Sequence, residues 1–563
     1  MDKSAEAAGM AADWRAKRYL LIDDFPSMRA MLRDILRNLG VRFVDQAGSG
    51  AEAVAALKRN KYDVVLCDYS LGAGKNGQQV LEEAKISDLV GPACIWLMIS
   101  AEKSVESVMG AAEYQPDGYL IKPITEGLLL ARLNRIWGKK QVFREIDRAF
   151  DAKDYLKAAR LCDARLATDK LHALDLLRMK ATLLLKSGEP EQARAVYEQI
   201  LAERDFAWAK AGLARIHVQN EDYESAKTLL QGVIAENQHY LDAYDQLAFV
   251  HQQKGEFGDA EQVLLAAAKL SPNSVLRQKN LGNVALKLGN IDIAEKAFRK
   301  SVEVGAHSVL KTPDSYLGLA RVCGQKDDPA EALQLLGAVQ KEFATPEVRL
   351  RAKITEGLVY HESGDWVKAR KSGEEMGRLV AESGAPPDTA TSLDMARLLL
   401  AVGVKDAPVD LLRDLVKNNH DNEQLAAEVQ EIFDKARMGE QGAALVEASR
   451  KEATEVMNKG VLLWKEGKAE EAIEWMRHAK SVLPSNVRIL FNFAHVMISA
   501  MQQKGVDSAM AAEARETLLQ ADRLSPNQRR FAQLMEILEK LAPTLEEEPE
   551  QGVAEGEAAS PPG

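Results

Sequence analysis

Residues 64–68 read Val64-Val65-Leu66-Cys67-Asp68, a short apolar run that ends in an acidic residue. Three other apolar runs in the same region also end in polar groups. They are Tyr19-Leu20-Leu21-Ile22 before Asp23-Asp24, Ile95-Trp96-Leu97-Met98-Ile99 before Ser100, and Gly118-Tyr119-Leu120-Ile121 before Lys122-Pro123. Such runs are typical of strands buried in a parallel sheet. Because the carboxyl ends of strands in an open parallel sheet gather in one crevice, we expect these polar side chains to converge there.

The chemistry of these side chains predicts a phosphoryl-acceptor site. Carboxylates about 4 Å apart repel by roughly 4 kcal/mol per pair at an effective dielectric near 20, so the cluster needs a divalent cation to stay ionised. Mg²⁺ fits, because it takes one or two carboxylates together with water and phosphate oxygens. We expect Asp68 to attack phosphorus while the metal and Lys122 neutralise the phosphoryl oxygens and Ser100 donates a hydrogen bond.

The order and spacing of these residues resemble the receiver domain of two-component response regulators. From the acidic pair ending at Asp24, the single Asp68 lies 44 residues on, Ser100 a further 32 and Lys122 a further 22. The resemblance covers roughly residues 16–138. It implies an α/β domain with a flavodoxin-like, doubly wound, five-stranded parallel sheet.

The resemblance also implies a role for each residue of the site. Asp68 is the phosphoacceptor; Asp24 and Asp68 are direct Mg²⁺ ligands, with Asp23 acting through water; the backbone carbonyl of Ser70 completes the metal site; and Ser100, Tyr119 and Lys122 are switch residues. The loop after Asp68 departs from the family pattern, since it lacks the usual proline and is one residue longer. Ser100 stands where the family often has threonine, and the hydroxyl is retained.

Composition narrows the class of protein. The chain has 563 residues, 46% hydrophobic and 28% charged, which is ordinary for a soluble protein of several domains. Its longest apolar stretch, Ala93–Ile99, is far shorter than the roughly 20 residues of a membrane-spanning helix. The amino terminus lacks the apolar core of a signal peptide, so we expect a cytoplasmic protein.

The four cysteines, Cys67, Cys94, Cys162 and Cys323, show no metal-ligand spacing. We expect them to be buried, reduced and without a metal or disulfide role. The net charge of −11 argues against binding nucleic acid without regard to sequence, because such binding depends on Lys and Arg.

Residues 125–138 have the pattern of an amphipathic helix, with Thr125 near its start and Gly138 at its end. No flexible linker follows, so we expect a rigid junction to the rest of the chain.

From Lys139 onward the pattern is almost wholly helical and it repeats. A short turn, often Gly followed by an acidic and an aromatic residue, is followed by a small residue. Successive alanines Ala158, Ala193, Ala226, Ala260 and Ala294 lie 35, 33, 34 and 34 residues apart, a period that resembles tetratricopeptide (TPR) helix pairs. Small residues such as Gly282 let paired helices approach, and large ones such as Phe298 fill the groove between them.

This similarity predicts an all-α TPR superhelix of about nine or ten repeats over residues 139–541, irregular at 313–450. Such arrays bind peptides or protein surfaces. His217 and His251 recur at equivalent positions of two repeats, where we expect them to be core residues rather than ligands. Residues 1–15 are expected to be a flexible amino terminus, and residues 542–563, rich in Glu, Pro and Gly, a disordered acidic tail.

The sequence favours one of four functions. The favoured one is a signalling adaptor: a sensor histidine kinase or histidine phosphotransfer protein phosphorylates Asp68, and the change alters which unknown protein the array binds. A DNA-binding regulator is disfavoured because the repeats leave no room for a helix-turn-helix module. An enzymatic output is disfavoured because the catalytic motifs sought are absent, so the receiver is expected to catalyse only its own phosphorylation and dephosphorylation. The alternative is a phosphate sink or inhibitor acting on the kinase and its transfer to another regulator.

Overall fold

The computed structural model describes residues 16–101, 113–383, 386–525 and 528–542. The expected flexible amino terminus, 1–15, and the expected acidic tail from residue 543 onward lie outside the described residues. The chain forms two compact units, residues 1–387 and 388–563. Among the described residues, no helix has the length and hydropathy that crossing a bilayer requires.

The first unit begins with a five-stranded sheet whose paired strands are all parallel, in the order β2-β1-β3-β4-β5. The strands are β1 (Arg18–Ile22), β2 (Phe43–Ala47), β3 (Val64–Asp68), β4 (Ile95–Ser100) and β5 (Gly118–Ile121). The two strands β3 and β4 are buried along their whole length, as their continuous apolar runs predict. The predicted doubly wound α/β sheet is therefore confirmed.

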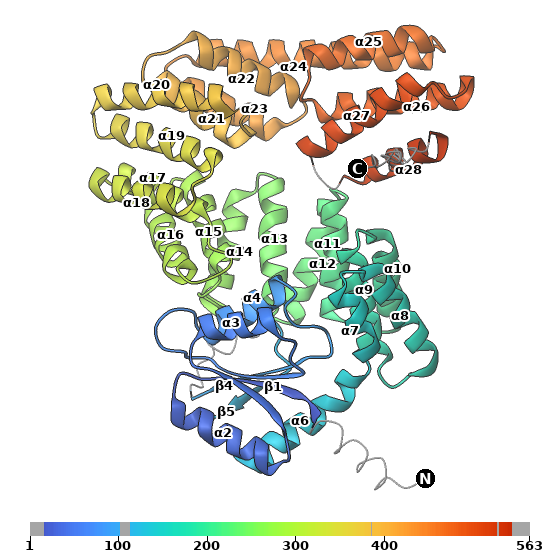
Figure 1. The fold of residues 1–563 in the computed structure, drawn as a ribbon. Helices are drawn as coiled ribbons and strands as arrows, with labels where there is room; N and C mark the ends of the chain where they lie inside the picture. The colour runs from blue at the N-terminus through green and yellow to red at the C-terminus, as the bar shows by residue number, and fades with distance from the viewer. Residues whose placement is uncertain (1–15, 102–112, 384–385, 526–527, 543–563) are drawn as a thin grey trace, which may run out of the picture. The chain divides into compact units, whose positions relative to one another are not determined.

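Helices cover both faces of this sheet (Figure 1): α3 and α4 lie on one face, α2 and α6 on the other. They are α2 (Pro26–Asn38), α3 (Gly50–Arg59), α4 (Gly77–Ile86) and α6 (Glu126–Gln141). The side chain of Asn76 accepts a hydrogen bond from the amide of Gln79, and the Gln79 side chain bonds the Asn76 amide in return, which fixes the start of α4.

The closing helix differs from its prediction at one end. Thr125 caps its first turn as expected, by accepting a hydrogen bond from the Leu128 amide. The end predicted at Gly138 is wrong, because α6 continues to Gln141. Beyond the glycine, Lys140 pairs with Asp117 at 2.9 Å and donates to the Pro92 carbonyl at 2.9 Å, contacts that hold the last turn on the sheet domain.

The junction to the helical array is short. Val142 and Phe143 are buried, and the next helix begins at Arg144. Asp147 of that helix accepts a hydrogen bond from the Ala93 amide of the sheet domain at 2.9 Å. The sheet domain and the first array helices are thus joined by packed and hydrogen-bonded residues, and the rigidity of the junction stays a prediction.

Among the remaining described helices, neighbours in the sequence pack against one another. In the first unit they are α7 (Arg144–Asp151), α8 (Tyr155–Thr168), α9 (Ala173–Lys186), α10 (Pro190–Glu203), α11 (Ala207–Gln219), α12 (Tyr223–Glu236), α13 (Leu241–Gln253), α14 (Phe257–Leu270), α15 (Val275–Lys287), α16 (Ile291–Gly305), α17 (Pro313–Gln325), α18 (Pro329–Glu342), α19 (Pro346–Glu362) and α20 (Trp366–Ser383). In the second they are α21 (Thr389–Ala401), α22 (Asp406–Asn418), α23 (Glu423–Lys435), α24 (Gly439–Lys465), α25 (Ala469–Val482), α26 (Val487–Lys504), α27 (Ser508–Leu524) and α28 (Arg529–Leu541).

The repeat signature read from the sequence matches the packing. The predicted alanines are all fully buried: Ala158, Ala193, Ala226, Ala260, Ala294, Ala369 and Ala472. The turns between the helices of a pair share a residue with positive φ, which is Gly188, Gly255, Gly289, Gly364 or Gly467 in some repeats and Lys153, Glu221, Asp327 or Arg437 in others. The turn geometry is therefore constant although its residue type is not.

The region predicted to be irregular departs from the common helix length. Helix α19 has 17 residues and α20 has 18, against 13 to 15 in the helices from α9 to α18. Helix α24 runs 27 residues and packs against both α23 and α25. One continuous helix there serves two neighbouring pairs, which explains why the sequence period is lost.

Phe298 shows how closely the helices approach one another. Its ring is fully buried between Gly282 of α15 and Gly318 of α17. A Cβ at Gly282 would lie 2.7 Å from the ring, and one at Gly318 would lie 2.4 Å from it. Only residues without a side chain fit at these two positions.

Replacing Gly282 with alanine should therefore destabilise the array by about 1–3 kcal/mol, because the added methyl group overpacks the Phe298 site. Gly232, in the interior of α12, is the matched control, since a Cβ there meets nothing within 4 Å. Gly232→Ala should be neutral or stabilising by up to about 1 kcal/mol. Thermal unfolding followed by circular dichroism compares them, and an unchanged Tm for Gly282→Ala would contradict this packing.

Candidate functional site

The polar residues that follow the strands meet at one edge of the sheet. Asp23 and Asp24 follow β1, Asp68 is the last residue of β3, and Lys122 follows β5. Carboxylate oxygens of Asp23, Asp24 and Asp68 all lie within 4.8 Å of one another. Asp23 and Asp68 are almost completely buried. The sheet thus brings together residues that are up to 99 positions apart in the sequence.

Lys122 bridges two of these carboxylates. Its Nζ lies 2.7 Å from Asp68 Oδ2 and 3.0 Å from Asp23 Oδ2. Burial lowers the pKa of the Lys122 ammonium, but the hydrogen bonds to Asp68 and Asp23 outweigh it, so that its pKa is raised overall. Burial raises the pKa of the Asp68 carboxyl, with a further rise from Asp23 and an opposing effect from Lys122. The ammonium is therefore held charged between two acidic groups.

The position of Asp23 is fixed by its neighbours. Its Oδ1 accepts a hydrogen bond from the Phe25 amide at 2.9 Å, and its backbone carbonyl accepts one from Arg29 at 2.5 Å. Asp24 is different, because its Oδ1 is buried and has no hydrogen-bond partner among the described residues. A buried carboxylate oxygen without a partner is costly unless a cation or ordered water satisfies it.

These residues fit a divalent cation. An unsatisfied oxygen of Asp24 lies beside the carboxylates of Asp23 and Asp68, and oxygen donors of this kind suit Mg²⁺. Asp24 and Asp68 would hold the ion directly, and Asp23, which is already bonded to Lys122 and to an amide, would act at longer range. Ser70 lies in the loop after β3, and the role of its carbonyl stays a prediction.

In the loop after Asp68, glycines allow the backbone conformation, and the proline that is usual in the family is absent. Gly72 and Gly74 have φ of +68° and +97°, values that side-chain-bearing residues rarely adopt. At Gly77, a Cβ would lie 1.9 Å from the Asp68 carbonyl oxygen. The Gly77 amide donates to the Tyr69 carbonyl at 2.9 Å, so the acceptor loop and the start of α4 are tied together.

The two other predicted switch residues lie on the neighbouring strands. Ser100 is the buried last residue of β4, and its carbonyl accepts a hydrogen bond from the Lys122 amide at 2.9 Å. Tyr119, in β5, is half-buried and packs against the core beneath α3 and α4. Ser100 therefore contacts the backbone of Lys122 directly, and Tyr119 lies three residues before Lys122 in the sequence.

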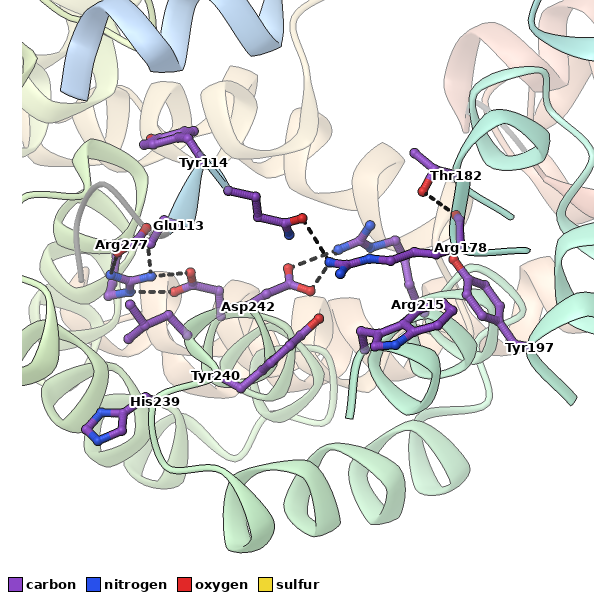
Figure 2. Close-up of a pocket in the computed structure, with 15 residues that line it drawn as sticks. Glu113, Tyr114, Arg178, Thr182, Tyr197, Arg215, His239, Tyr240, Asp242 and Arg277 are labelled. Carbon is purple, nitrogen blue, oxygen red and sulfur yellow. Dashed lines mark hydrogen bonds and ion pairs between the residues drawn. The ribbon is translucent and has the colours of Figure 1, made fainter. Parts of the chain in front are cut away.

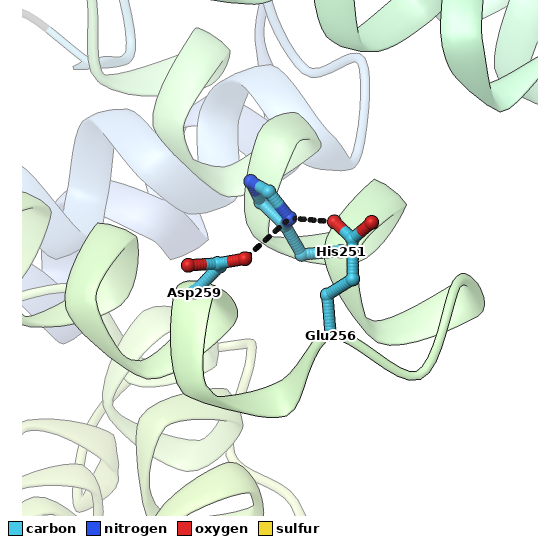
Figure 3. Close-up of side chains that lie close together, drawn as sticks. All are labelled: His251, Glu256 and Asp259. Carbon is cyan, nitrogen blue, oxygen red and sulfur yellow. Dashed lines mark hydrogen bonds and ion pairs between the residues drawn. The ribbon is translucent and has the colours of Figure 1, made fainter.

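A second cluster of potential ligands, His251, Glu256 and Asp259, lies in the array (Figure 3). His251 Nδ1 is 2.5 Å from Glu256 Oε2 and 3.9 Å from Asp259 Oδ2. Glu256 also pairs with Lys254 at 2.7 Å and Lys227 at 2.9 Å, and these contacts lower the pKa of its carboxyl to about 2. Two ammonium groups already neutralise this glutamate, so the cluster does not call for a metal.

The same arrangement recurs one repeat earlier. His217 Nδ1 lies 2.9 Å from Asp222 Oδ2, the same five-residue separation as His251 and Glu256. Each histidine lies in the last turn of the first helix of a pair and bonds the acidic N-cap residue of the next helix. His251 is buried and His217 half-buried, so the prediction of a packing role is confirmed for His251 and fits His217 less completely.

The sheet domain also contacts the array far from the junction, which the sequence did not predict. Asp88 pairs with Lys186 at 2.7 Å and accepts a hydrogen bond from Tyr155 at 2.8 Å. Gln79 of α4 donates to the Val304 carbonyl at 2.8 Å, and Glu82 of α4 accepts a hydrogen bond from Ser308. Glu82 is buried, and burial raises its pKa against the opposing effect of Ser308 and Tyr114.

The cysteines are buried, as predicted. All four are free and buried, and burial raises the pKa of Cys94 and of Cys162 to about 12. A thiol in that state is a small apolar residue rather than a nucleophile.

Comparison with known families agrees with this description. Residues 19–134 match the response regulator receiver domain family, and residues 184–248, 217–284, 279–346 and 456–486 match tetratricopeptide repeat families. The chemotaxis protein CheY-3 of Vibrio cholerae is 31% identical over 120 residues, which are 21% of this chain and 91% of that protein. The chemotaxis protein CheY of Pseudomonas aeruginosa is 27% identical over 120 residues, 21% of this chain and 95% of that protein.

Two solved structures are similar to part of this chain. The chemotaxis protein CheY4 of Vibrio cholerae is 26% identical and covers 21% of this chain and 98% of its own, with a TM-score of 0.20. A CheY-like receiver domain protein from Methanospirillum hungatei is 23% identical and covers 22% of this chain and 97% of its own, with a TM-score of 0.21.

Removing Asp24 tests the metal site. Asp24→Asn should weaken Mg²⁺ binding about tenfold or more, because a charged ligand with an otherwise unsatisfied oxygen is lost. Isothermal titration of the full chain with MgCl₂ measures it. Asp34→Asn is the matched control, since Asp34 is an exposed carboxylate of α2. Equal Mg²⁺ affinity for Asp24→Asn and Asp34→Asn would show that Asp24 is not a ligand.

Proposed function

Because the chain belongs to the response regulators, with a receiver domain followed by TPR repeats, we propose that it accepts a phosphoryl group on Asp68 from a sensor histidine kinase or a histidine phosphotransfer protein. It then signals through protein contacts of the array, without DNA binding and without a catalytic output. The observation that supports this most is the Lys122 ammonium, 2.7 Å from Asp68 and 3.0 Å from Asp23, at the carboxyl ends of parallel strands.

In the proposed transfer, a carboxylate oxygen of Asp68 attacks the phosphorus of a phosphohistidine. The P–O bond to Asp68 forms as the P–N bond to the donor's imidazole breaks; the electron pair of the P–N bond returns to that nitrogen, and the ring, which already carries a proton on its other nitrogen, leaves as neutral imidazole. Mg²⁺, when bound by Asp24 and Asp68, supplies positive charge to the phosphoryl oxygens. Lys122 gives up its contact with Asp68 and pairs with a phosphoryl oxygen, while the Ser100 hydroxyl donates a hydrogen bond to another.

Two connections support a signal from this site to the array. Helix α4 is tied to the acceptor loop through the Gly77 amide, and its residues Gln79 and Glu82 contact the array at Val304 and Ser308. Glu113, which comes 13 residues after Ser100 in the sequence, bonds Arg277 of α15. These contacts favour an adaptor, whose array responds to the receiver, over a phosphate sink, which needs no such contacts.

Asp68→Asn should abolish labelling by acetyl phosphate or a cognate kinase, because an amide does not form the acyl phosphate. Incubation of the full chain with ³²P-labelled acetyl phosphate and Mg²⁺ measures the transfer, with Asp34→Asn as the control that should label like wild type. Undiminished labelling of Asp68→Asn would place the acceptor elsewhere.

Ser100→Ala should leave Asp68 able to accept the phosphoryl group while weakening the effect of phosphorylation on partner binding, because the hydroxyl is the group expected to move toward the phosphate. Partners captured by the wild-type chain, with and without phosphorylation, define the effect to be lost. If the phosphorylated Ser100→Ala chain retained its partners as wild type does, and wild type itself responded to phosphorylation, this route would be excluded.

A further inference from the structure

A cavity of about 490 Å³ lies where the receiver meets the first array repeats (Figure 2). Its floor comes from the first helices of successive pairs, α9, α11, α13 and α15. Residues Glu113, Tyr114 and Gln115 of the receiver form its opposite side. The face of the array that lines this cavity is therefore already in contact with a short segment of the same chain.

Arg277 binds the first residue of this segment. Its side chain is 1% exposed, and its guanidinium makes two bonds to Asp245, at 2.9 and 2.7 Å. The remaining edge donates to Glu113 Oε1 at 3.0 Å and to the Ser271 carbonyl at 3.1 Å. Burial lowers the pKa of Arg277, but Asp245 and Glu113 outweigh it and raise it overall.

Since Asp245 belongs to the array, Arg277 keeps one carboxylate partner even without the receiver. Glu113 is the second carboxylate partner of Arg277. The planar guanidinium presents its N–H donors in a fixed geometry that matches a carboxylate well. The array thus contains a preformed place for a carboxylate, which the receiver fills in this structure.

Arg178 binds the last residue of the segment. Its Nη2 donates to Gln115 Oε1 at 2.8 Å, and its guanidinium lies 5.3 Å from the centroid of the Trp208 ring. Among the described residues, no carboxylate forms an ion pair with Arg178. A charged acceptor in place of the Gln115 amide would make a shorter and roughly twice stronger hydrogen bond.

Two features show that the receiver segment is not the best ligand for this face. Gln115 has a φ of +50°, a conformation that costs energy for a residue with a side chain. Tyr114 points away from the array, since its hydroxyl donates to Glu82 of the receiver at 2.6 Å. The array therefore contacts residues 113 and 115 through polar side chains and leaves the residue between them to the receiver.

We propose that this face of the array, from α9 to α15, binds an acidic segment of a partner protein with two carboxylates two residues apart. One carboxylate pairs with Arg277 beside Asp245, and the other pairs with Arg178 above Trp208. Glu113 and Gln115 of the receiver hold the same two places, so the receiver and the partner compete for them. The proposal rests on the proposed function, since it names the chemistry of the partner through which the array signals.

Competition between the receiver segment and the partner also explains how phosphorylation of Asp68 would change partner binding. Residues 113–115 follow Ser100 in the chain by fewer than 16 positions, and α4 contacts both the acceptor loop and the array. A shift of the receiver on phosphorylation withdraws Glu113 and Gln115 and exposes Arg277 and Arg178 together. The partner then binds a face that the receiver otherwise covers.

The test uses the full chain and a fluorescein-labelled, amidated peptide, Gly-Gly-Glu-Tyr-Glu-Pro-Asp, whose last five residues follow positions 113–117 with an acid in place of Gln115. Glu113→Gln weakens the hold of the receiver without changing its shape. Fluorescence anisotropy should show this peptide binding Glu113→Gln about tenfold more tightly than wild type. Glu126→Gln, an exposed carboxylate of the receiver, is the matched control and should bind like wild type.

Two further variants test whether Arg178 binds the peptide. Adding Arg178→Gln to Glu113→Gln should reverse the gain about tenfold, whereas adding Arg194→Gln, a partly exposed arginine of α10 that does not line the cavity, should not. A peptide with Gln and Asn in place of its acids should not bind. Equal affinity of wild type and Glu113→Gln, or no loss with Arg178→Gln, would overturn the proposal.

The same preparations separate this proposal from the acceptor role. A Glu113→Gln chain that is labelled on Asp68 yet does not bind the peptide contradicts the proposed binding face alone. A wild-type chain that binds as described but is not labelled on Asp68 contradicts the proposed function alone. Circular dichroism of every variant shows whether its helices are intact.

Discussion

The ammonium of Lys122 between Asp23 and Asp68 is the contact on which the receiver depends. Three carboxylates that approach within 4.8 Å of one another repel, by roughly 4 kcal/mol per pair at about 4 Å and an effective dielectric near 20. One cation reaches two of them, and the third, Asp24, keeps a buried oxygen without a partner among the described residues. The site is thus neutralised in part, which leaves it ready for a divalent ion and a phosphoryl group.

Helix α4 contacts both this charged site and the array. Helix α4 starts at Gly77, where any side chain would collide with the Asp68 carbonyl, and two of its residues contact the array. The exposed pair between Asp88 and Lys186 adds little on its own, because surface ion pairs contribute about 0–1 kcal/mol. The contacts of Glu82 with Ser308 and of Arg277 with Glu113 are different, since Glu82, Ser308 and Arg277 are buried and buried charges are screened much less by solvent and salt.

The convergence of the site residues and the burial of the repeat alanines could be predicted from the sequence, because strand ends and periodicity determine them. Apolar runs that end in Asp23, Asp68, Ser100 and Lys122 had to converge once the strands paired in parallel, and the buried alanines followed from the repeat period. The closing helix was predicted to stop at Gly138 and continues to Gln141, because contacts of Lys140 with the sheet domain outweigh the weak helix propensity of glycine.

Contacts between elements that are distant in the chain could not be predicted from the sequence. Glu113 and Arg277 are 164 residues apart, and Glu82 and Ser308 are 226 apart, in elements whose own patterns are complete without one another. Arg277 is buried, although the repeat pattern of turns and small residues gives no role to its position. Only the docked receiver shows that its second carboxylate partner comes from another domain.

We propose that the state of Asp68 determines how the receiver contacts the array. Hydrogen exchange measured by mass spectrometry on the full chain tests it, with beryllium fluoride and Mg²⁺ added to mimic the phosphoryl group. The account predicts faster exchange in residues 304–311, which contact α4, and no change in Asp68→Asn. Identical exchange in this segment with and without beryllium fluoride, in a wild-type chain shown to bind it, would contradict the account.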